Sequence, residues 1–321
     1  MDRSILETIG SPLVQVSSPP GSIIAAKLES RNPGGSAKDR PALAMVERAE
    51  RDGHLEPGGH LVESTSGNTG IGLAMVAAVK GYDLTIVLPA SKSVERRRLL
   101  KAYGAEIELV DGDMTAARER ADQLEADEGM VQLRQFENEA NVMAHYRSTA
   151  EELLAQTGDR PIDAFVATVG TGGTLTGIGR RLREVYPEVE IVAVEPETNP
   201  VLSTGEPGAD DFQGMGPGFV SEILDVELID TVETVALDAA EAACRRLAGD
   251  QGILVGQSSG AAYLAAGRVA ERLGDPAMEC PEAPDRDRRM LTDGEGAGCP
   301  LVATVFPDSG ERYLTAGTFD G

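Results

Sequence analysis

One segment joins the first buried strand to the first long helix, and it reads Ser30-Arg31-Asn32-Pro33-Gly34-Gly35-Ser36-Ala37-Lys38-Asp39-Arg40. Its Asn-Pro-Gly-Gly run is made of turn residues, which end the preceding strand. Ser36 and Asp39 form an S-x-x-D pattern, which predicts a helix start with a capping box. We therefore expect strand, loop and helix here, with Lys38 in the first helical turn.

Lys38 is an unusual residue for the start of a helix. The positive end of the helix dipole disfavours a cation there and would help the amine to lose its proton. A neutral amine suits a lysine that acts as a nucleophile or a base. The alternative is a solvated lysine at a helix start, and this segment alone does not decide between the two.

The same alternation of apolar runs and helical patterns continues along the chain. Strands are predicted at residues 23–28, 60–63, 84–88, 106–110, 131–133, 164–169 and 191–194. Helices are predicted at residues 37–52, 69–80, 94–103, 114–126, 139–156, 175–185 and 261–273. This repetition predicts an α/β fold with mainly parallel sheets. Such sheets bind ligands at the carboxyl ends of their strands.

A chain of 321 residues has room for two α/β domains. The long helix at residues 139–156 separates four strand–helix units from a second series that begins at Ala164. We expect a smaller domain over residues 36–148 and a larger one over residues 1–35 and 149–321. A cleft between two such domains is the usual place for a ligand.

The charge balance is strongly acidic, with 29 Lys and Arg against 53 Asp and Glu and a net charge of −24. Such a surface repels nucleic acid, so we expect no nucleic-acid partner. The excess is spread along the chain, aromatic residues are few, and tryptophan is absent. This pattern favours a protein of a salt-loving organism, predicted to be haloarchaeal, over an ordinary acidic cytosolic protein.

The cellular location of the protein is predicted from the absence of two sequence signals. Residues 1–10 do not have the pattern of a signal peptide, and no apolar run is long enough to span a membrane. The three cysteines, Cys244, Cys280 and Cys299, do not form a disulfide framework, so we expect a reducing cytoplasm. Residues 274–300 read as a solvated surface loop, and a bridge or metal clip between Cys280 and Cys299 is not expected.

Three more loops join a strand to a helix and carry small polar residues. In Val169-Gly170-Thr171-Gly172-Gly173-Thr174-Leu175, glycines let backbone N–H groups approach an anion, which predicts a phosphate cradle. Ser64-Thr65-Ser66-Gly67-Asn68-Thr69-Gly70 suits a carboxylate in the same way. A tight turn with an N-cap is the alternative for both. Val255-Gly256-Gln257-Ser258-Ser259-Gly260 places serines at a helix start, where they are usually caps.

Motifs for other chemistries are absent from the sequence. There is no H-E-x-x-H, no C-x-x-C and no G-x-S-x-G, so no metal site and no hydrolase nucleophile are expected. A lysine, a phosphate cradle and a carboxylate loop together are what a pyridoxal phosphate enzyme acting on an amino acid requires.

The combined motifs resemble those of the O-acetylserine sulfhydrylases, or cysteine synthases, in the tryptophan synthase β-like, fold-type II group of pyridoxal phosphate enzymes. Cystathionine β-synthase is close kin. The likeness extends from residues 9–13 to residues 309–314, and segments 101–105 and 144–146 are closer to the B-type synthases. The family's lysine segment, substrate loop and phosphate loop match residues 32–40, 65–69 and 170–174.

The resemblance implies two doubly wound α/β domains with the cofactor in the cleft between them, and it implies roles for individual residues. Lys38 would carry the cofactor as an internal aldimine and act as the base. Asn68 would bond the cofactor's ring oxygen, and Ser258 would face its pyridine nitrogen. The phosphate would be held by Gly170, Thr171, Gly172, Gly173 and Thr174. The substrate would be held by Thr65, Ser66, Gly67, Thr69, Gln135 and Gly214.

The implied reaction is a β-replacement in cysteine biosynthesis. Acetate leaves Cβ of O-acetyl-L-serine, giving an α-aminoacrylate, and sulfide adds to it to form L-cysteine. Two other enzymes are alternatives: a cystathionine β-synthase, which uses serine and homocysteine, and an O-phosphoserine sulfhydrylase. A non-catalytic binding module is a third alternative, and the retained Lys38 argues against it. The resemblance also implies a homodimer and admits serine acetyltransferase as a partner.

Two departures from the family pattern leave points open. The loop at residues 274–300 is longer than usual, so its role is not defined. Arg134 precedes Gln135, and an inward side chain would suit an anionic leaving group such as phosphate. Neighbouring strand residues point to opposite faces, so we expect Arg134 to point outward.

Overall fold

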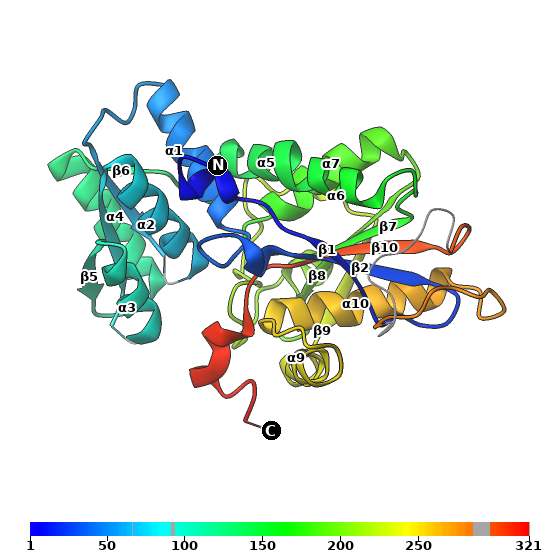
Figure 1. Ribbon diagram of the computed structural model, residues 1–321. Helices are drawn as coiled ribbons and strands as arrows, with labels where there is room; N and C mark the ends of the chain where they lie inside the picture. The colour runs from blue at the N-terminus through cyan, green and yellow to red at the C-terminus, as the bar shows by residue number, and fades with distance from the viewer. Residues whose placement is uncertain (66, 91–93, 285–295, 321) are drawn as a thin grey trace. The chain divides into compact units, whose positions relative to one another are not determined.

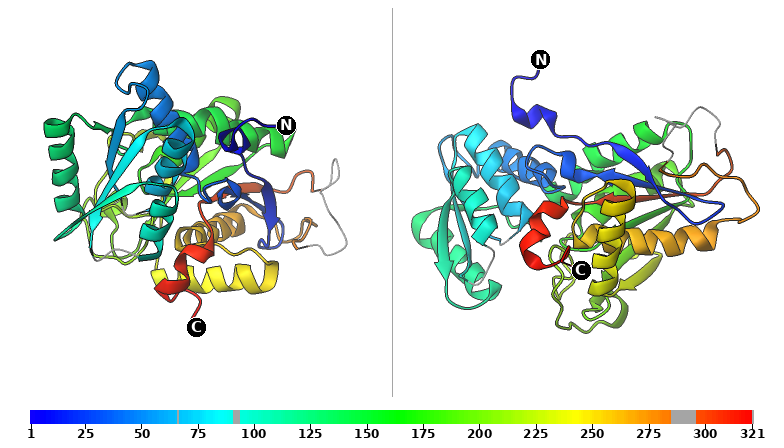
Figure 2. Two further views of the ribbon diagram at one scale, coloured as in Figure 1. Left: turned by 60° about the vertical axis from the view of Figure 1, so that its left-hand side comes forward. Right: turned by 60° about the horizontal axis from the view of Figure 1, so that its bottom comes forward.

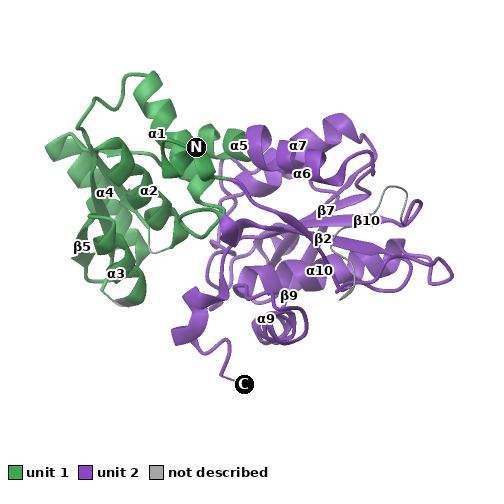
Figure 3. Cartoon of the chain, in the orientation of Figure 1, with its two compact units in different colours: residues 1–9, 32–145 green, residues 10–31, 146–321 purple. Residues whose placement is uncertain are grey.

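A computed structural model describes residues 1–65, 67–90, 94–284 and 296–320 (Figure 1). The chain divides into two compact units, each with a sheet of its own (Figure 3). Unit 1 comprises residues 1–9 and 32–145, and unit 2 comprises residues 10–31 and 146–321. The third crossing between units, from His145 to Tyr146, falls in a π-helical turn, His145–Thr149.

Unit 1 is built on a parallel sheet with the strand order β5-β4-β3-β6. Its strands are β3 (His60–Ser64), β4 (Asp83–Pro89), β5 (Glu106–Val110) and β6 (Val131–Gln132). Its helices are α1 (Asp39–Arg51), α2 (Asn68–Lys80), α3 (Val94–Ala102), α4 (Met114–Glu128) and α5 (Glu139–Ala144). One apolar cluster packs α1 and α2 on one face of the sheet, and a second packs α4 on the other.

Unit 2 is built on a sheet with the strand order β1-β2-β10-β7-β8-β9, parallel except for the β1–β2 pair. Its strands are β1 (Leu13–Val16), β2 (Ile23–Leu28), β7 (Ala164–Thr168), β8 (Glu190–Pro196), β9 (Thr231–Val235) and β10 (Leu301–Phe306). Its α-helices are α6 (Ala150–Thr157), α7 (Gly173–Val185), α8 (Val201–Thr204), α9 (Leu237–Gln251) and α10 (Gln257–Leu273).

Helices cover both faces of the unit 2 sheet. Apolar side chains of α9 and α10 pack on one face, and those of α6 and α7 pack on the other. Figures 1 and 2 show α9 and α10 together on one side of the strands. Because both faces are covered, the central strands are mostly apolar, as in β10, where every residue is buried and only Thr304 is polar.

The predicted α/β fold with mainly parallel sheets is confirmed, and the differences lie in single elements. The helix predicted over residues 139–156 is interrupted by the π-helical turn between α5 and α6. Strands β1, β9 and β10 and helix α9 were not predicted. A short apolar run such as β10 cannot be told from a buried helix by its periodicity, so only its neighbours in the sheet identify it.

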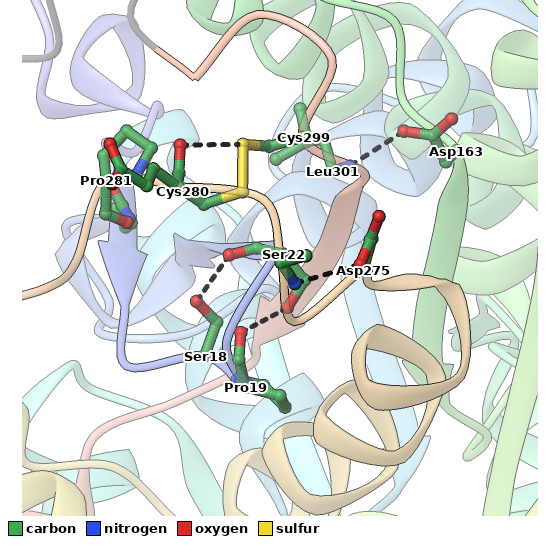
Figure 4. The surroundings of a disulfide bond; sticks show 12 residues. Ser18, Pro19, Ser22, Asp163, Asp275, Cys280, Pro281, Cys299 and Leu301 are labelled. Atoms are coloured by element: carbon green, nitrogen blue, oxygen red, sulfur yellow. Dashed lines mark hydrogen bonds between the residues drawn. A yellow bond between two sulfur atoms is a disulfide. The ribbon is translucent and has the colours of Figure 1, made fainter.

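The expectation for Cys280 and Cys299 was wrong, because the structure joins them by a disulfide (Figure 4). Their Cα atoms lie 6.0 Å apart, although 19 positions separate them in sequence. The bridge ties the described start of the 274–300 segment to its end, just before β10. Gln15 on β1 donates its amide to the Pro281 carbonyl at 2.6 Å, and Ser17 donates to the Ala283 carbonyl at 2.8 Å. The cytoplasmic location on which that expectation relied stays a prediction.

Two absences concern the described part of the chain. None of its helices is long and apolar enough to cross a membrane. Its His, Cys, Asp and Glu side chains form no group of three that could hold a metal ion.

Candidate functional site

Lys38 lies at the entrance to α1, as its N-cap residue, and its side chain is half-buried. The capping box expected there has other partners in the structure. The Ser36 hydroxyl accepts the Lys38 N–H at 3.2 Å, and the Asp39 carboxylate accepts the Gly34 N–H at 2.5 Å. These two bonds hold the loop against the start of α1. They fix the backbone immediately before and after Lys38.

Helix α2 packs closely against the Lys38 backbone within unit 1. A Cβ atom at Gly72 would lie 2.9 Å from the Lys38 carbonyl oxygen, so this approach requires glycine. Gly72 is one helical turn after Asn68, the first residue of α2. The lysine segment and the start of α2 are therefore neighbours, as a shared site requires.

The loop after β3 leads into α2 and holds the predicted substrate residues. Thr65 and Thr69 are buried, and the Gly67 N–H donates to the Thr65 hydroxyl at 3.3 Å. No side chain of the described residues caps α2 from its N-cap position, Gly67. The backbone N–H groups of a helix start attract a carboxylate. Ser66, also predicted to bind substrate, lies outside the described residues.

Gln135 reaches the same helix start from the turn after β6. It is buried, and the Thr69 hydroxyl donates to its Oε1 atom at 2.6 Å. Asn141 on α5 donates to the Gln135 carbonyl at 2.9 Å. The structure thus brings together two predicted substrate residues that are 66 positions apart in sequence.

Arg134 points outward, as predicted, but for a different reason. It lies in a turn and not in the strand, and it is the only non-glycine residue with a positive φ, 52°, among those that the structure describes. Its guanidinium donates to Asp122 at 3.4 Å and to Glu125, both on α4. The arginine therefore takes part in a surface ion pair and gives no support for a phosphate leaving group.

The predicted phosphate loop of unit 2 follows β7 and ends in α7. Gly172 is the N-cap of α7 with φ +88°, and a Cβ atom there would lie 2.8 Å from the Leu224 Cβ. A Cβ atom at Gly170 would lie 2.8 Å from the Gly214 carbonyl oxygen. The Gly173 N–H points to the Thr171 hydroxyl at 3.4 Å. Glycine is thus required at two positions of this loop.

Gly214 belongs to a second loop that packs against the phosphate loop. The Gly216 N–H donates to the Val169 carbonyl at 3.0 Å, directly before Gly170. The Gln213 N–H donates to Gln257 Oε1 at 3.1 Å. Gln257 is the first residue of α10, and Ser258 follows it, buried at the helix start. The predicted residues of unit 2 therefore lie around one set of loops at the carboxyl ends of its strands.

A buried network supports these loops, and sequence reasoning missed it. The Gln257 amide donates to Glu241 at 2.9 Å and to Thr318 at 3.2 Å. Tyr313 donates to Asp308 at 2.8 Å. The sequence signal for this network is limited to Gln257, a polar residue that begins a buried helix.

The unit 2 loops fit the phosphate and ring of pyridoxal phosphate. The N-cap residue of α7 is Gly172, which has no side chain, and the backbone N–H groups of a helix start favour an anion such as phosphate. At the start of α10 the buried Ser258 offers a hydroxyl that can hydrogen-bond to a ring nitrogen. The donor set therefore suits a phosphorylated aromatic cofactor and not a metal.

Comparison with known proteins agrees with this chemistry. Residues 6–278 match the family model described as pyridoxal-phosphate dependent enzyme. A cysteine synthase of Staphylococcus aureus is 48% identical over 294 residues, which cover 91% of this chain and 87% of that protein.

Solved structures give the same result. An O-ureido-L-serine synthase is 40% identical with a TM-score of 0.89, over 100% of this chain and 96% of the other. A cysteine synthase of Entamoeba histolytica is 35% identical with a TM-score of 0.88, over 100% and 91% of the two chains. The chain therefore belongs to the family of pyridoxal-phosphate-dependent enzymes.

Proposed function

We propose that this protein is a cysteine synthase, which makes L-cysteine from O-acetyl-L-serine and sulfide. The observation that carries the proposal is the 48% identity to a cysteine synthase across 91% of the chain. The geometry of unit 1 supports it, because Thr69 and Gln135 meet at the start of α2, and a helix start suits an amino-acid carboxylate.

The residues of the chain have separate tasks in this proposal. Lys38 binds the cofactor and takes the proton from Cα of the substrate. The Gly170–Thr174 loop holds the cofactor phosphate, and Ser258 and Asn68 orient its ring. Thr65, Ser66, Thr69 and Gln135 hold the substrate carboxylate, Gly67 belongs to the same substrate loop, and Gly214 lines the pocket. When bound, pyridoxal phosphate withdraws electrons from Cα, which allows a leaving group to depart from Cβ.

Turnover by matched lysine variants tests the proposal. The purified holoenzyme is given O-acetylserine and sulfide, and free cysteine is measured. Lys38→Ala should lose at least ~10³-fold in kcat, because one group acts both as attachment point and as base. Lys101→Ala, which removes an exposed lysine of α3 in the same unit, should keep wild-type turnover.

The alternatives make different predictions in the same assay. Turnover of O-phosphoserine, or of serine with homocysteine, in place of O-acetylserine and sulfide would overturn the cysteine synthase proposal and keep the cofactor chemistry. The outward Arg134 disfavours the first of these. A holoenzyme inactive on every substrate would indicate a binding module. The homodimer, the serine acetyltransferase partner, the cytoplasm and the halophilic source stay predictions.

A further inference from the structure

Glu63 is a buried carboxylate that the proposed reaction does not use. It lies on β3 among apolar neighbours, two residues before Thr65, and only 4% of its surface is exposed. A buried carboxylate costs folding free energy unless hydrogen bonds satisfy it. We therefore ask which groups satisfy the Glu63 carboxylate and what its charge contributes to the site.

The Glu63 carboxylate binds the backbone of the turn that carries Gln135. Its Oε2 atom accepts the N–H groups of Leu133 and Arg134, each at 3.2 Å, and the Gln135 N–H also bonds to the carboxylate. Asn138 closes the turn from the other side by donating to the Leu133 carbonyl at 2.8 Å. The turn is thus organised around one carboxylate.

This turn has a backbone conformation that is unfavourable by itself. Arg134 has a φ of 52°, a region that costs a residue with a side chain about 1 kcal/mol. Convergent N–H donors to a single charged acceptor can offset that cost, since hydrogen bonds to ionised groups are the strong ones. The conformation in turn directs the Gln135 side chain to the Thr69 hydroxyl, 2.6 Å away.

We propose that Glu63 is a positioning residue for the amino-acid substrate, because it holds the Leu133–Gln135 turn so that Gln135 meets Thr69 at the start of α2. The inference rests on the proposed function, in which Thr69 and Gln135 bind the substrate carboxylate. It adds a residue that touches neither substrate nor cofactor and acts through the backbone of the turn.

Charge on Glu63 should therefore affect substrate binding. Burial raises the pKa of Glu63 to about 7, while the N–H groups of the turn and the Arg134 charge act in the opposite direction. The neutral acid accepts hydrogen bonds more weakly than the carboxylate does. As the pH falls from 8 to 6, the turn should loosen and the KM for O-acetylserine should rise.

None of the other charged groups named here can take over the role of the Glu63 carboxylate. The Arg134 guanidinium lowers the pKa of Glu63 from a distance, but it points outward and is paired with Asp122 and Glu125 of α4. On β4 the charged residue is Asp83, which pairs in register with His60, three positions before Glu63. On α2 the charge is Lys80, at the far end of the helix, where it binds Glu50. Strand β6 carries no charged residue.

The test compares Glu63→Gln with Glu125→Gln in the holoenzyme. Glu63→Gln keeps the shape and an acceptor oxygen but lacks the charge, so at pH 8 its KM for O-acetylserine should rise about tenfold with little change in kcat. The ratio of its KM to that of the wild type should approach one at pH 6. Glu125→Gln removes a charge from the outer side of the same turn and should keep the wild-type KM and pH profile.

A second measurement does not depend on activity. Hydrogen exchange followed by mass spectrometry on a peptide covering residues 131–138 should be faster in Glu63→Gln than in Glu125→Gln at pH 8. Equal exchange, or a KM ratio that does not change between pH 8 and pH 6, would overturn the inference. Absence of turnover in the wild type contradicts the proposed function instead, and leaves the exchange experiment as the test of Glu63.

Discussion

Two loops of this protein connect the carboxyl end of a parallel strand to the start of a helix whose N-cap residue is a glycine. After β7, the Gly170–Thr174 loop takes its shape from its backbone, since Cβ atoms at Gly170 and Gly172 would each lie 2.8 Å from a neighbouring atom. After β3, the loop is flanked by side chains, with Thr69 bonded to Gln135 and Glu63 bonded to the turn that carries Gln135. A ligand held during every turnover suits the first kind of support. A ligand that enters and leaves suits the second, because side-chain hydrogen bonds can break and re-form.

The largest effect should follow from a methyl group in the backbone-built loop. Gly172→Ala adds a Cβ atom 2.8 Å from Leu224 at a φ of +88°, so crowding adds to backbone strain. We expect the purified protein to lose most of its pyridoxal phosphate and at least ~100-fold of its activity, given a combined penalty of about 3 kcal/mol. The cofactor released on denaturation measures the first effect directly.

Gly205→Ala is the matched control for that variant. Gly205 ends α8 in the same unit at a φ of +77°, with open space around the added methyl group. It shares the backbone strain but not the crowding, so it should lower stability slightly and keep the cofactor. Equal cofactor loss in both variants would mean that strain alone, and not the close packing of the loop, decides binding.

An intermediate effect should follow from a change in the side-chain-built loop. Thr69→Val keeps the shape of the side chain but removes the hydroxyl that donates to Gln135. A buried acceptor left without its donor costs about 1–3 kcal/mol, so the KM for O-acetylserine should rise about 5- to 150-fold while the cofactor stays bound. Steady-state kinetics and cofactor content together separate this result from that of Gly172→Ala.

Thr85→Val provides the corresponding control for Thr69. Thr85 is also buried in unit 1, and its hydroxyl is 2.8 Å from His60, at the opposite end of β3 from the loop. Its replacement should reduce thermal stability without changing the KM. If both threonine variants raise the KM alike, the effect would reflect a general loosening of unit 1.

The smallest effect is expected at Arg134, beside the second loop. Arg134→Gln removes an exposed ion pair with Glu125 and Asp122, which contributes about 1 kcal/mol or less. The KM for O-acetylserine should change less than about twofold. A large rise in KM would show that the guanidinium contacts the substrate. It would then support the alternative in which the leaving group is phosphate.

The same comparison shows which parts of the site the sequence can predict. The Gly170–Thr174 loop and the start of α2 were predicted because strand, loop and helix are contiguous and the turn chemistry is local. Glu63 and Gln257 were not, because their partners lie 70 and 44 positions away in the chain. Such contacts depend on strand order, and β10, whose place between β2 and β7 fixes the unit 2 sheet, was itself not predicted.

The Cys280–Cys299 bridge has a consequence for the outer strand of the unit 2 sheet. Strand β1 ends that sheet, and an uncovered outer strand can recruit a strand from another molecule and start aggregation. The bridge anchors a proline-containing segment whose carbonyl groups accept hydrogen bonds from Gln15 and Ser17 beside β1. Proline lacks the N–H group that a growing sheet needs. The disulfide therefore holds a segment with a proline next to the outer strand of the unit 2 sheet, where proline does not favour the addition of another strand.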